Sequence, residues 1–260
     1  DDCERIQQDQ FRDFKDVFGR IHPDIAVVCL CGNHDIGNRP TPKSIEKFRS
    51  AFGDEYLAFW TNGTYNILLN NVLFTNPDGA PQMFLDQLHW LQERLQYANQ
   101  HQAAQIFVFG HHPWFLYNDE EDEQSVADFH GGKGSSFPRE WDDGSGRFDD
   151  AVFPDSYFTV PKKYRTMAMD LFREYHVSAC FSGHFHQNLV SKSSFGMDMI
   201  VTGPLSMVFD SAGKPTQSEV NGRGIRVVEV SVPMESGDRS TSSSRRKLGN
   251  GSFVHRFEAI

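Results

Sequence analysis

Three apolar segments of this chain each run directly into a short stretch that carries imidazole or amide side chains. Residues 32–38 read Gly-Asn-His-Asp-Ile-Gly-Asn, residues 110–113 read Gly-His-His-Pro, and residues 183–186 read Gly-His-Phe-His. Neutral imidazole nitrogen and amide oxygen are ligands for borderline divalent ions such as Zn²⁺, Fe²⁺ and Mn²⁺. The chain has no Cys-x-x-Cys pair of the kind that builds a closed structural zinc site. The combination predicts a metal site with open positions, which favours hydrolytic chemistry.

The segments that precede these stretches predict buried strands. Residues 25–31, 105–109 and 177–182 are apolar-rich runs of the length that parallel strands use. The carboxyl ends of parallel strands lie along one edge of an open sheet, and ligands gather there. We therefore expect the three stretches to meet at one edge of one sheet.

The remaining pattern predicts an α/β fold in a single domain spanning residues 1–260. A hairpin with a tight Asn62-Gly63 turn is expected over residues 57–70. Amphipathic periodicity predicts four helices, at residues 4–20, 42–52, 81–95 and 161–175. Late strands are expected at residues 197–203, 224–232 and 253–260. The order of elements indicates parallel strands first and antiparallel strands later.

Charge and composition narrow the class of protein. Of the net charge of −10, a local charge of −9 lies in residues 118–155, which we interpret as an acidic flexible insertion. A second polar stretch, residues 236–251, is interpreted as a Ser/Arg-rich loop. An acidic chain without a basic stripe predicts no nucleic-acid partner and no membrane partner. Four cysteines are too few for a disulfide scaffold, so a cytoplasmic location is expected.

The motifs resemble those of the calcineurin-like metallophosphoesterases. The pattern of that family runs Asp-x-His, Gly-Asp-x-x-Asp, Gly-Asn-His-Asp/Glu, His and Gly-His-x-His, and its last three elements are present here in order. Within the family, residues 32–38, the hairpin over 57–70 and residues 184–188 most resemble the subfamily of calcineurin-like phosphoesterase domain-containing protein 1. That subfamily is described as cytosolic Ser/Thr-protein phosphatases. The resemblance implies a four-layer α/β/β/α sandwich that lacks its first strands.

The resemblance also implies roles for single residues. Asn33, His111 and His184 would bind one metal, and His186 would bind a second. The cofactors would be two divalent metal ions (Mn, Fe or Zn), and the substrate a phosphoprotein or a small phosphoester.

The same resemblance gives His34 the role of general acid toward the leaving oxygen, with Asp35 orienting its ring. His112 is expected to be a supporting or exposed residue beside the metal ligands. The oligomeric state is left open.

The first two motifs of the family have no counterpart in this chain, and we expect them ahead of residue 1, so that catalysis by these residues alone would be impaired. Three alternatives stay open. One is a purple-acid-phosphatase-like enzyme, and another is a phosphodiesterase of the same superfamily. The third is a non-catalytic metal-binding interaction module.

Overall fold

The computed structural model describes residues 2–122, 135–136, 152–153, 155–205, 208–209, 215–216, 223–231 and 251–259. Most of the acidic segment 118–155, and all of the Ser/Arg-rich loop 236–251 except Gly251, lie outside the described residues. These two interpretations therefore stay predictions over most of their length.

A six-stranded sheet forms the centre of the molecule. Its strand order is β1-β2-β3-β6-β8-β7. The four central strands run parallel, and an antiparallel strand flanks them at each edge. This confirms the mixed α/β fold with a mostly parallel sheet. The strands are β1 (Leu57–Thr61), β2 (Thr64–Leu68), β3 (Gln105–Phe109), β6 (Ala179–Ser182), β7 (Leu189–Lys192) and β8 (Asp198–Val201).

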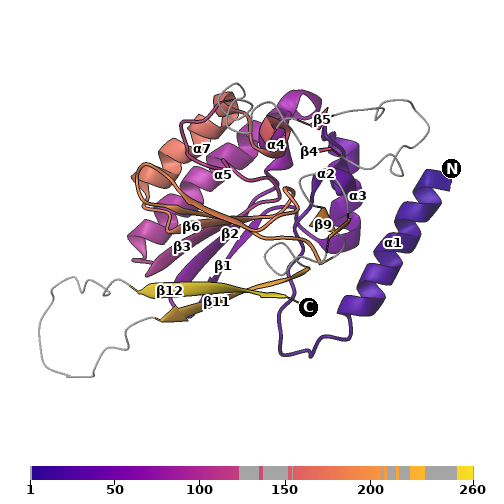
Figure 1. Cartoon of the computed structure of the whole chain (residues 1–260), viewed down its shortest axis with the longest axis horizontal. Coiled ribbons are helices and arrows are strands. Elements are labelled where there is room, and N and C mark those ends of the chain that lie inside the picture. The colour runs from indigo at the N-terminus through magenta and orange to yellow at the C-terminus, as the bar shows by residue number, and fades with distance from the viewer. Residues whose placement is uncertain are drawn as a thin grey trace, which may run out of the picture.

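Helices cover one face of the sheet and a β-ribbon covers the other. Helices α5 (Pro81–Gln100) and α7 (Lys162–Glu174) lie on one side, while β11 (Gly224–Ser231) and β12 (Ser252–Ala259) pair on the opposite side (Figure 1). Three of the four expected layers are thus found among the described residues.

Alternation along β3 explains how one strand serves both faces. Ile106 and Val108 belong to the core on the helical side, whereas Phe107 and Phe109 belong to the core under the ribbon. The ring of Phe107 lies 4.9 Å from the ring of Phe253 on β12. Successive side chains of a strand point to opposite faces, so a continuous apolar run is what a strand covered on both sides requires.

The N-terminal part packs at the side of this body. Helix α1 (Asp2–Phe18) stands beside it and meets α3 (Pro42–Phe52), with the rings of Phe11 and Phe52 4.8 Å apart (Figure 1). Thr41 caps α3 by accepting a hydrogen bond from the Ser44 backbone N–H. The remaining short elements are α2 (Asn33–Ile36), α4 (Val72–Thr75), β4 (Ser135–Ser136), β5 (Val152–Phe153), β9 (Val208–Phe209), β10 (Pro215–Thr216) and the 3₁₀ turns Pro77–Gly79 and Asp155–Phe158.

The expected hairpin is confirmed, down to its turn. β1 and β2 pair antiparallel, and Asn62 and Gly63 join them with φ of 43° and 78°. Positive φ at both central residues is the backbone of a type I′ turn, whose twist matches that of the flanking strands.

The prediction of a strand at residues 25–31 is wrong. The segment is irregular, and it pairs with none of the described strands. Ile25, Val27 and Val28 are 59%, 47% and 40% exposed. A strand is stable only when its backbone groups pair with a neighbour. The apolar composition of residues 25–31 was therefore not enough to predict a strand.

Candidate metal centre

Three donor atoms from three distant parts of the chain converge at the sheet edge. Nε2 of His111 lies 2.9 Å from Oδ1 of Asn33 and 3.1 Å from Nδ1 of His184. His111 follows β3 and His184 follows β6, and these two strands are parallel neighbours. The expectation that the strand ends share one edge therefore holds for β3 and β6, and the loop at Asn33 joins them without a preceding strand.

Gly32 and Asp35 shape the loop that presents Asn33. Asp35 Oδ2 accepts a hydrogen bond of 2.7 Å from the Gly32 backbone N–H, which closes the short turn α2. A Cβ atom at position 32 would lie 2.7 Å from Cε1 of His111. Glycine is needed here because the imidazole of His111 fills the space that any side chain would take.

Asn38 fixes the amide orientation of Asn33. The Asn33 Nδ2 donates to Asn38 Oδ1 over 2.9 Å, which leaves the Asn33 oxygen turned toward His111. The Asn38 side chain in turn meets the hydroxyl of Tyr157. Both asparagines of the stretch 32–38 therefore contribute to the centre. Asn33 offers its side-chain oxygen, and Asn38 holds the Asn33 amide in that orientation.

A buried asparagine holds the loop of His111 and His112. Asn71 Oδ1 accepts from the His112 N–H at 3.1 Å, and Asn71 Nδ2 donates to the His112 carbonyl at 2.7 Å. His112 itself is only 4% exposed, and its ring centroid is 4.0 Å from that of His184. His112 was expected to be either a supporting residue beside the metal ligands or an exposed one. Its burial and its contact with His184 agree with the first expectation and contradict the second.

The loop after β6 holds two histidines in the left-handed backbone region. His184 has φ of 61° and His186 has φ of 57°. Non-glycine residues with positive φ cost of order 1–3 kcal/mol each and gather at functional sites. The rings of Tyr157 and Phe158 lie 5.5 Å from that of His184 and shield it on the side of the loop before α7.

Burial keeps the imidazoles of this centre neutral. It lowers the pKa of His111 to about 4 and of His184 to about 2, and positive charge on neighbouring histidines adds to both effects. Burial is also the largest cause that lowers the pKa of His112 and of His186. A neutral imidazole offers a lone pair to a cation, so the electrostatics suit a metal ligand.

His34 is the exposed member of the group. A positive charge on it lowers the pKa of His111, His184 and His186, so its ring lies within electrostatic range of all three. Asp35 is half-buried, and burial raises the pKa of its carboxyl group while the Gly32 N–H and His34 oppose that rise. Its carboxylate is engaged with the Gly32 backbone.

The donor set fits a divalent ion better than it fits a hydrogen-bond network. Asn33 Oδ1, His111 Nε2 and His184 Nδ1 bring three lone-pair atoms together. Both short contacts involve His111 Nε2, which carries at most one proton, so only one of the two can be a full hydrogen bond. Among the described residues, the acid and imidazole groups that gather within 4.8 Å of one another are His111, His112 and His184, and no carboxylate joins them. Imidazole and amide donors suit zinc, iron or manganese.

Sequence reasoning missed three supporting residues. Asn38 lies inside the stretch 32–38, so the repeated asparagine was an available signal. Asn71 follows β2 as a polar residue after an apolar strand, which is the same signal that pointed to His111 and His184. Nothing in the sequence pattern marks Tyr157, because its contact depends on how the loop before α7 folds back.

In the part of the chain that the structure describes, none of the helices has both the length and the apolar character that crossing a bilayer demands.

Known proteins resemble this chain along most of its length. No protein-family model matches it. The Ser/Thr-protein phosphatase CPPED1 of Danio rerio is 31% identical over 225 residues, which cover 86% of this chain and 59% of that protein. The proteins of the same name from Rattus norvegicus and Homo sapiens are both 30% identical, over 88% and 76% of this chain and 60% and 52% of their own lengths. The chain thus spans between half and two thirds of these relatives, and the expected resemblance is confirmed.

Among solved structures, a dimetal phosphatase from Danio rerio aligns with a TM-score of 0.41 and 14% identity, over 69% of this chain and 61% of that one.

Proposed function

The chain is a homologue of the Ser/Thr-protein phosphatases named CPPED1, and from this premise we propose that it is a metal-dependent phosphoester hydrolase. The substrate class would be phosphoserine or phosphothreonine in proteins, with small phosphoesters as accessible surrogates. The observation that carries the proposal is the convergence of Asn33 Oδ1, His111 Nε2 and His184 Nδ1, at 2.9 and 3.1 Å, at the end of two parallel strands.

In this proposal Asn33, His111 and His184 hold one divalent ion, and His186 contributes to a second. Manganese, iron and zinc are the candidates, because the donors are imidazole nitrogens and an amide oxygen. The low pKa values of His111 and His184 support the assignment, since both rings are unprotonated at neutral pH. Asn38 supports it by keeping the amide nitrogen of Asn33 turned away from the centre.

Divalent cations at such a centre, when bound, supply Lewis acidity toward a phosphoryl group and lower the pKa of water. The chain's own groups do the rest. His34 protonates the oxygen of the leaving alcohol from its exposed position. Asp35 places His34 by closing the turn on which both residues stand, through its bond to Gly32. Tyr157 and Phe158 exclude water from one side of His184.

A cytoplasmic location is part of the proposal. Cys29, Cys31 and Cys180 are free thiols in the structure. Cys180 lies in the core and Cys29 packs against it, and this burial raises the pKa of both thiols. A thiol with a raised pKa stays protonated, so it behaves as a small apolar residue and is unreactive. Free, unreactive thiols suit a reducing compartment.

A second candidate is a metal-binding module without turnover. It is favoured by one observation, that the imidazole group of His111, His112 and His184 includes no carboxylate among the described residues. A module of this kind would bind a single ion and release no phosphate. The two candidates therefore differ in measurable ways.

Metal stoichiometry is the first test. We expect the purified chain, loaded with manganese or zinc and dialysed, to retain the ion by inductively coupled plasma mass spectrometry. His111→Ala and His184→Ala should lose it. His89→Ala is the matched control, because His89 has a 75% exposed side chain on α5 beside Glu93. Retention of the ion in His111→Ala would refute the proposed centre.

The general acid is the second test. His34→Ala should lower kcat on a phosphoserine peptide by about 100-fold, the usual contribution of a proton donor. The loss on p-nitrophenyl phosphate should be far smaller, because nitrophenolate leaves without a proton. Equal losses on both substrates would remove His34 from that role. Metal binding with no phosphate release from either substrate would favour the module.

A further inference from the structure

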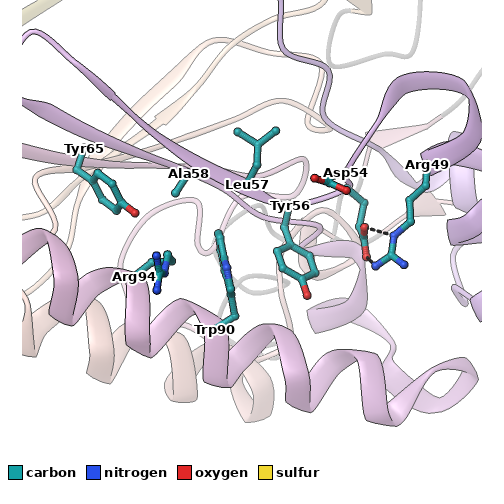
Figure 2. Close-up of a pocket in the computed structure, with 9 residues that line it drawn as sticks. Arg49, Asp54, Tyr56, Leu57, Ala58, Tyr65, Trp90 and Arg94 are labelled. Atoms are coloured by element: carbon teal, nitrogen blue, oxygen red, sulfur yellow. Dashed lines mark hydrogen bonds and ion pairs between the residues drawn. The ribbon is translucent and has the colours of Figure 1, made fainter.

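A cavity of about 430 Å³ opens between the start of β1 and helix α5, on the helical side of the sheet. Figure 2 shows its lining residues in a row, with Arg49, Asp54 and Tyr56 at one end and Arg94 and Tyr65 at the other. Cavities of a few hundred Å³ are the usual size of small-molecule sites. None of the residues assigned to the metal centre lines it.

Aromatic rings form the middle of this cavity. The ring centroids of Tyr56 and Trp90 are 4.8 Å apart, and their planes are inclined by 56°. Tyr65 lines the same space from β2, next to Arg94 (Figure 2). Inclined aromatic walls of this kind accept a flat ring in an offset or edge-to-face arrangement.

Arg94 is a cation without an anionic partner. It forms no ion pair with any described residue, and its Nε is buried without a hydrogen-bond acceptor in the described part of the chain. Its guanidinium lies 5.5 Å from the ring of Tyr97, which covers one face. Buried donors are almost always paired in folded proteins. The guanidinium shares a hydrogen bond with the Tyr65 hydroxyl, and no described carboxylate neutralises its charge, so an anionic acceptor in the cavity would be attracted to it.

Arg49, at the other end, is already neutralised. It forms two hydrogen bonds with the carboxylate of Glu55, whose side chain is only 1% exposed. Asp54 is exposed at that same end (Figure 2). An anionic group would thus be repelled at the Asp54 end and attracted at the Arg94 end. The charges therefore give an occupant a single orientation.

We propose that this cavity binds a small aromatic monocarboxylate. Its ring lies against Trp90 and Tyr56, and its carboxylate accepts hydrogen bonds from the guanidinium of Arg94. Trp90 and Arg94 are four residues apart on α5, so they occupy the same face of the helix and meet the two ends of one ligand. A planar guanidinium suits a carboxylate because the two groups can form paired hydrogen bonds.

The site is separate from the metal centre. Leu57, which lines the cavity, pairs with Leu68. Leu68 pairs with Phe109, two positions before His111. β1 and β3 thus stand two strands apart, on the order of 10 Å at the usual spacing. The proposal holds whether or not the protein hydrolyses phosphoesters.

Nuclear magnetic resonance on the ¹⁵N-labelled full chain, kept free of metal with a chelator, tests the site. The chain has four tryptophans, and each gives one indole N–H signal. Trp90→Phe identifies the signal of Trp90, and Trp114, which is 1% exposed in the core, is the internal reference. Indole-3-acetate should shift the Trp90 signal with a Kd on the order of 1 mM, as expected for so small a ligand.

Arg94→Gln should weaken this binding at least ~10-fold. Arg173→Gln is the matched control, because Arg173 also stands on a helix over an aromatic ring, 5.1 Å from Phe195. It should bind the probe as the unmodified chain does. Equal binding by Arg94→Gln would overturn the proposal.

A comparison of ligands on the unmodified chain covers the case in which Arg94→Gln does not fold. Indole-3-ethanol lacks the carboxylate and acetate lacks the ring, so both should bind at least ~10-fold more weakly than indole-3-acetate. Equal affinity for either analogue, or an equal shift of Trp114, would overturn the proposal.

Discussion

A methyl group at position 32 would compete with the His111 ring for the same space. The backbone of Gly32, with φ of −112° and ψ of 178°, is one that any residue adopts, so the demand for glycine is purely steric. The imidazole stands between the Asn33 oxygen and His184, so displacing it separates the donor atoms.

Gly32→Ala is therefore expected to lower the affinity for manganese or zinc by about 10-fold or more, since 1.4 kcal/mol of displaced contact already gives that factor. Folding should be kept, as judged by circular dichroism. Gly183→Ala is the matched control at the other strand end, because its Cβ would meet nothing nearer than the Thr202 carbonyl oxygen at 4.0 Å. Similar metal affinities for the two variants, in a competition titration with a chromophoric chelator, would contradict this steric account.

The residue types in the centre could be predicted from the sequence, but their mutual orientation could not. Amide and imidazole groups after apolar runs gave Asn33, His111 and His184. Asn38 turns the Asn33 amide, and Asp35 binds the Gly32 N–H. Both contacts depend on backbone geometry that the sequence does not show directly. The burial that lowers the pKa of His184 likewise depends on packing, with Tyr157 and Phe158 against its ring.

At the scale of elements, two buried amide side chains hold the chain where it leaves β2. Gln87 on α5 bonds to both the N–H and the carbonyl of Asn70, at 2.8 and 2.9 Å. Asn71 does the same for His112. Each side chain imitates a strand neighbour and satisfies two backbone groups that would otherwise be buried without partners.

Asn71→Ala and Gln87→Ala should each destabilise the fold by about 2 to 4 kcal/mol, because each leaves two buried backbone groups unsatisfied. Only Asn71→Ala should also weaken metal binding, since it frees the loop of His111. The measurements are urea unfolding and metal titration of the folded variants. Loss of metal affinity in both variants to the same degree would mean that general loosening, and not the loop of His111, controls the centre.

The helices and most of the strands of the central sheet could be predicted from periodicity, whereas two segments, β7 and residues 25–31, could not. β7 is only four residues long and half-exposed, so its pattern is too short to read. Residues 25–31 have the composition of a buried strand but no partner among the described strands. The antiparallel strands also lie at both edges of the sheet and not only late in the chain, because the hairpin adds β1 outside β2.

For the whole molecule, a bound ion would join segments that lie far apart along the chain. The proposed ligands come from the loop at Asn33, the end of β3 and the end of β6. An ion that binds only the folded chain stabilises it according to its concentration relative to Kd.

Manganese or zinc at 100 times its Kd should thus raise stability by about 2.7 kcal/mol, or roughly 5 to 10 °C in Tm for a chain of this size. A chelator should reverse the gain, and His184→Ala should show none, whereas His89→Ala should respond like the unmodified chain. Differential scanning fluorimetry measures all four. An unchanged Tm of the unmodified chain on addition of the ion would contradict the proposed metal centre.

The distances along the chain between the converging atoms have a consequence for synthesis. Asn33 and His111 are 78 positions apart, and His111 and His184 are 73. A ribosome adding roughly 5 to 20 residues per second needs about 4 to 15 s to pass from His111 to His184. During that interval β3 is made but β6, its parallel neighbour, is not. During synthesis the edge of β3 that later pairs with β6 therefore has no partner strand. The ion can bind with all three proposed ligands only after β6 has paired with β3 and placed His184 beside His111.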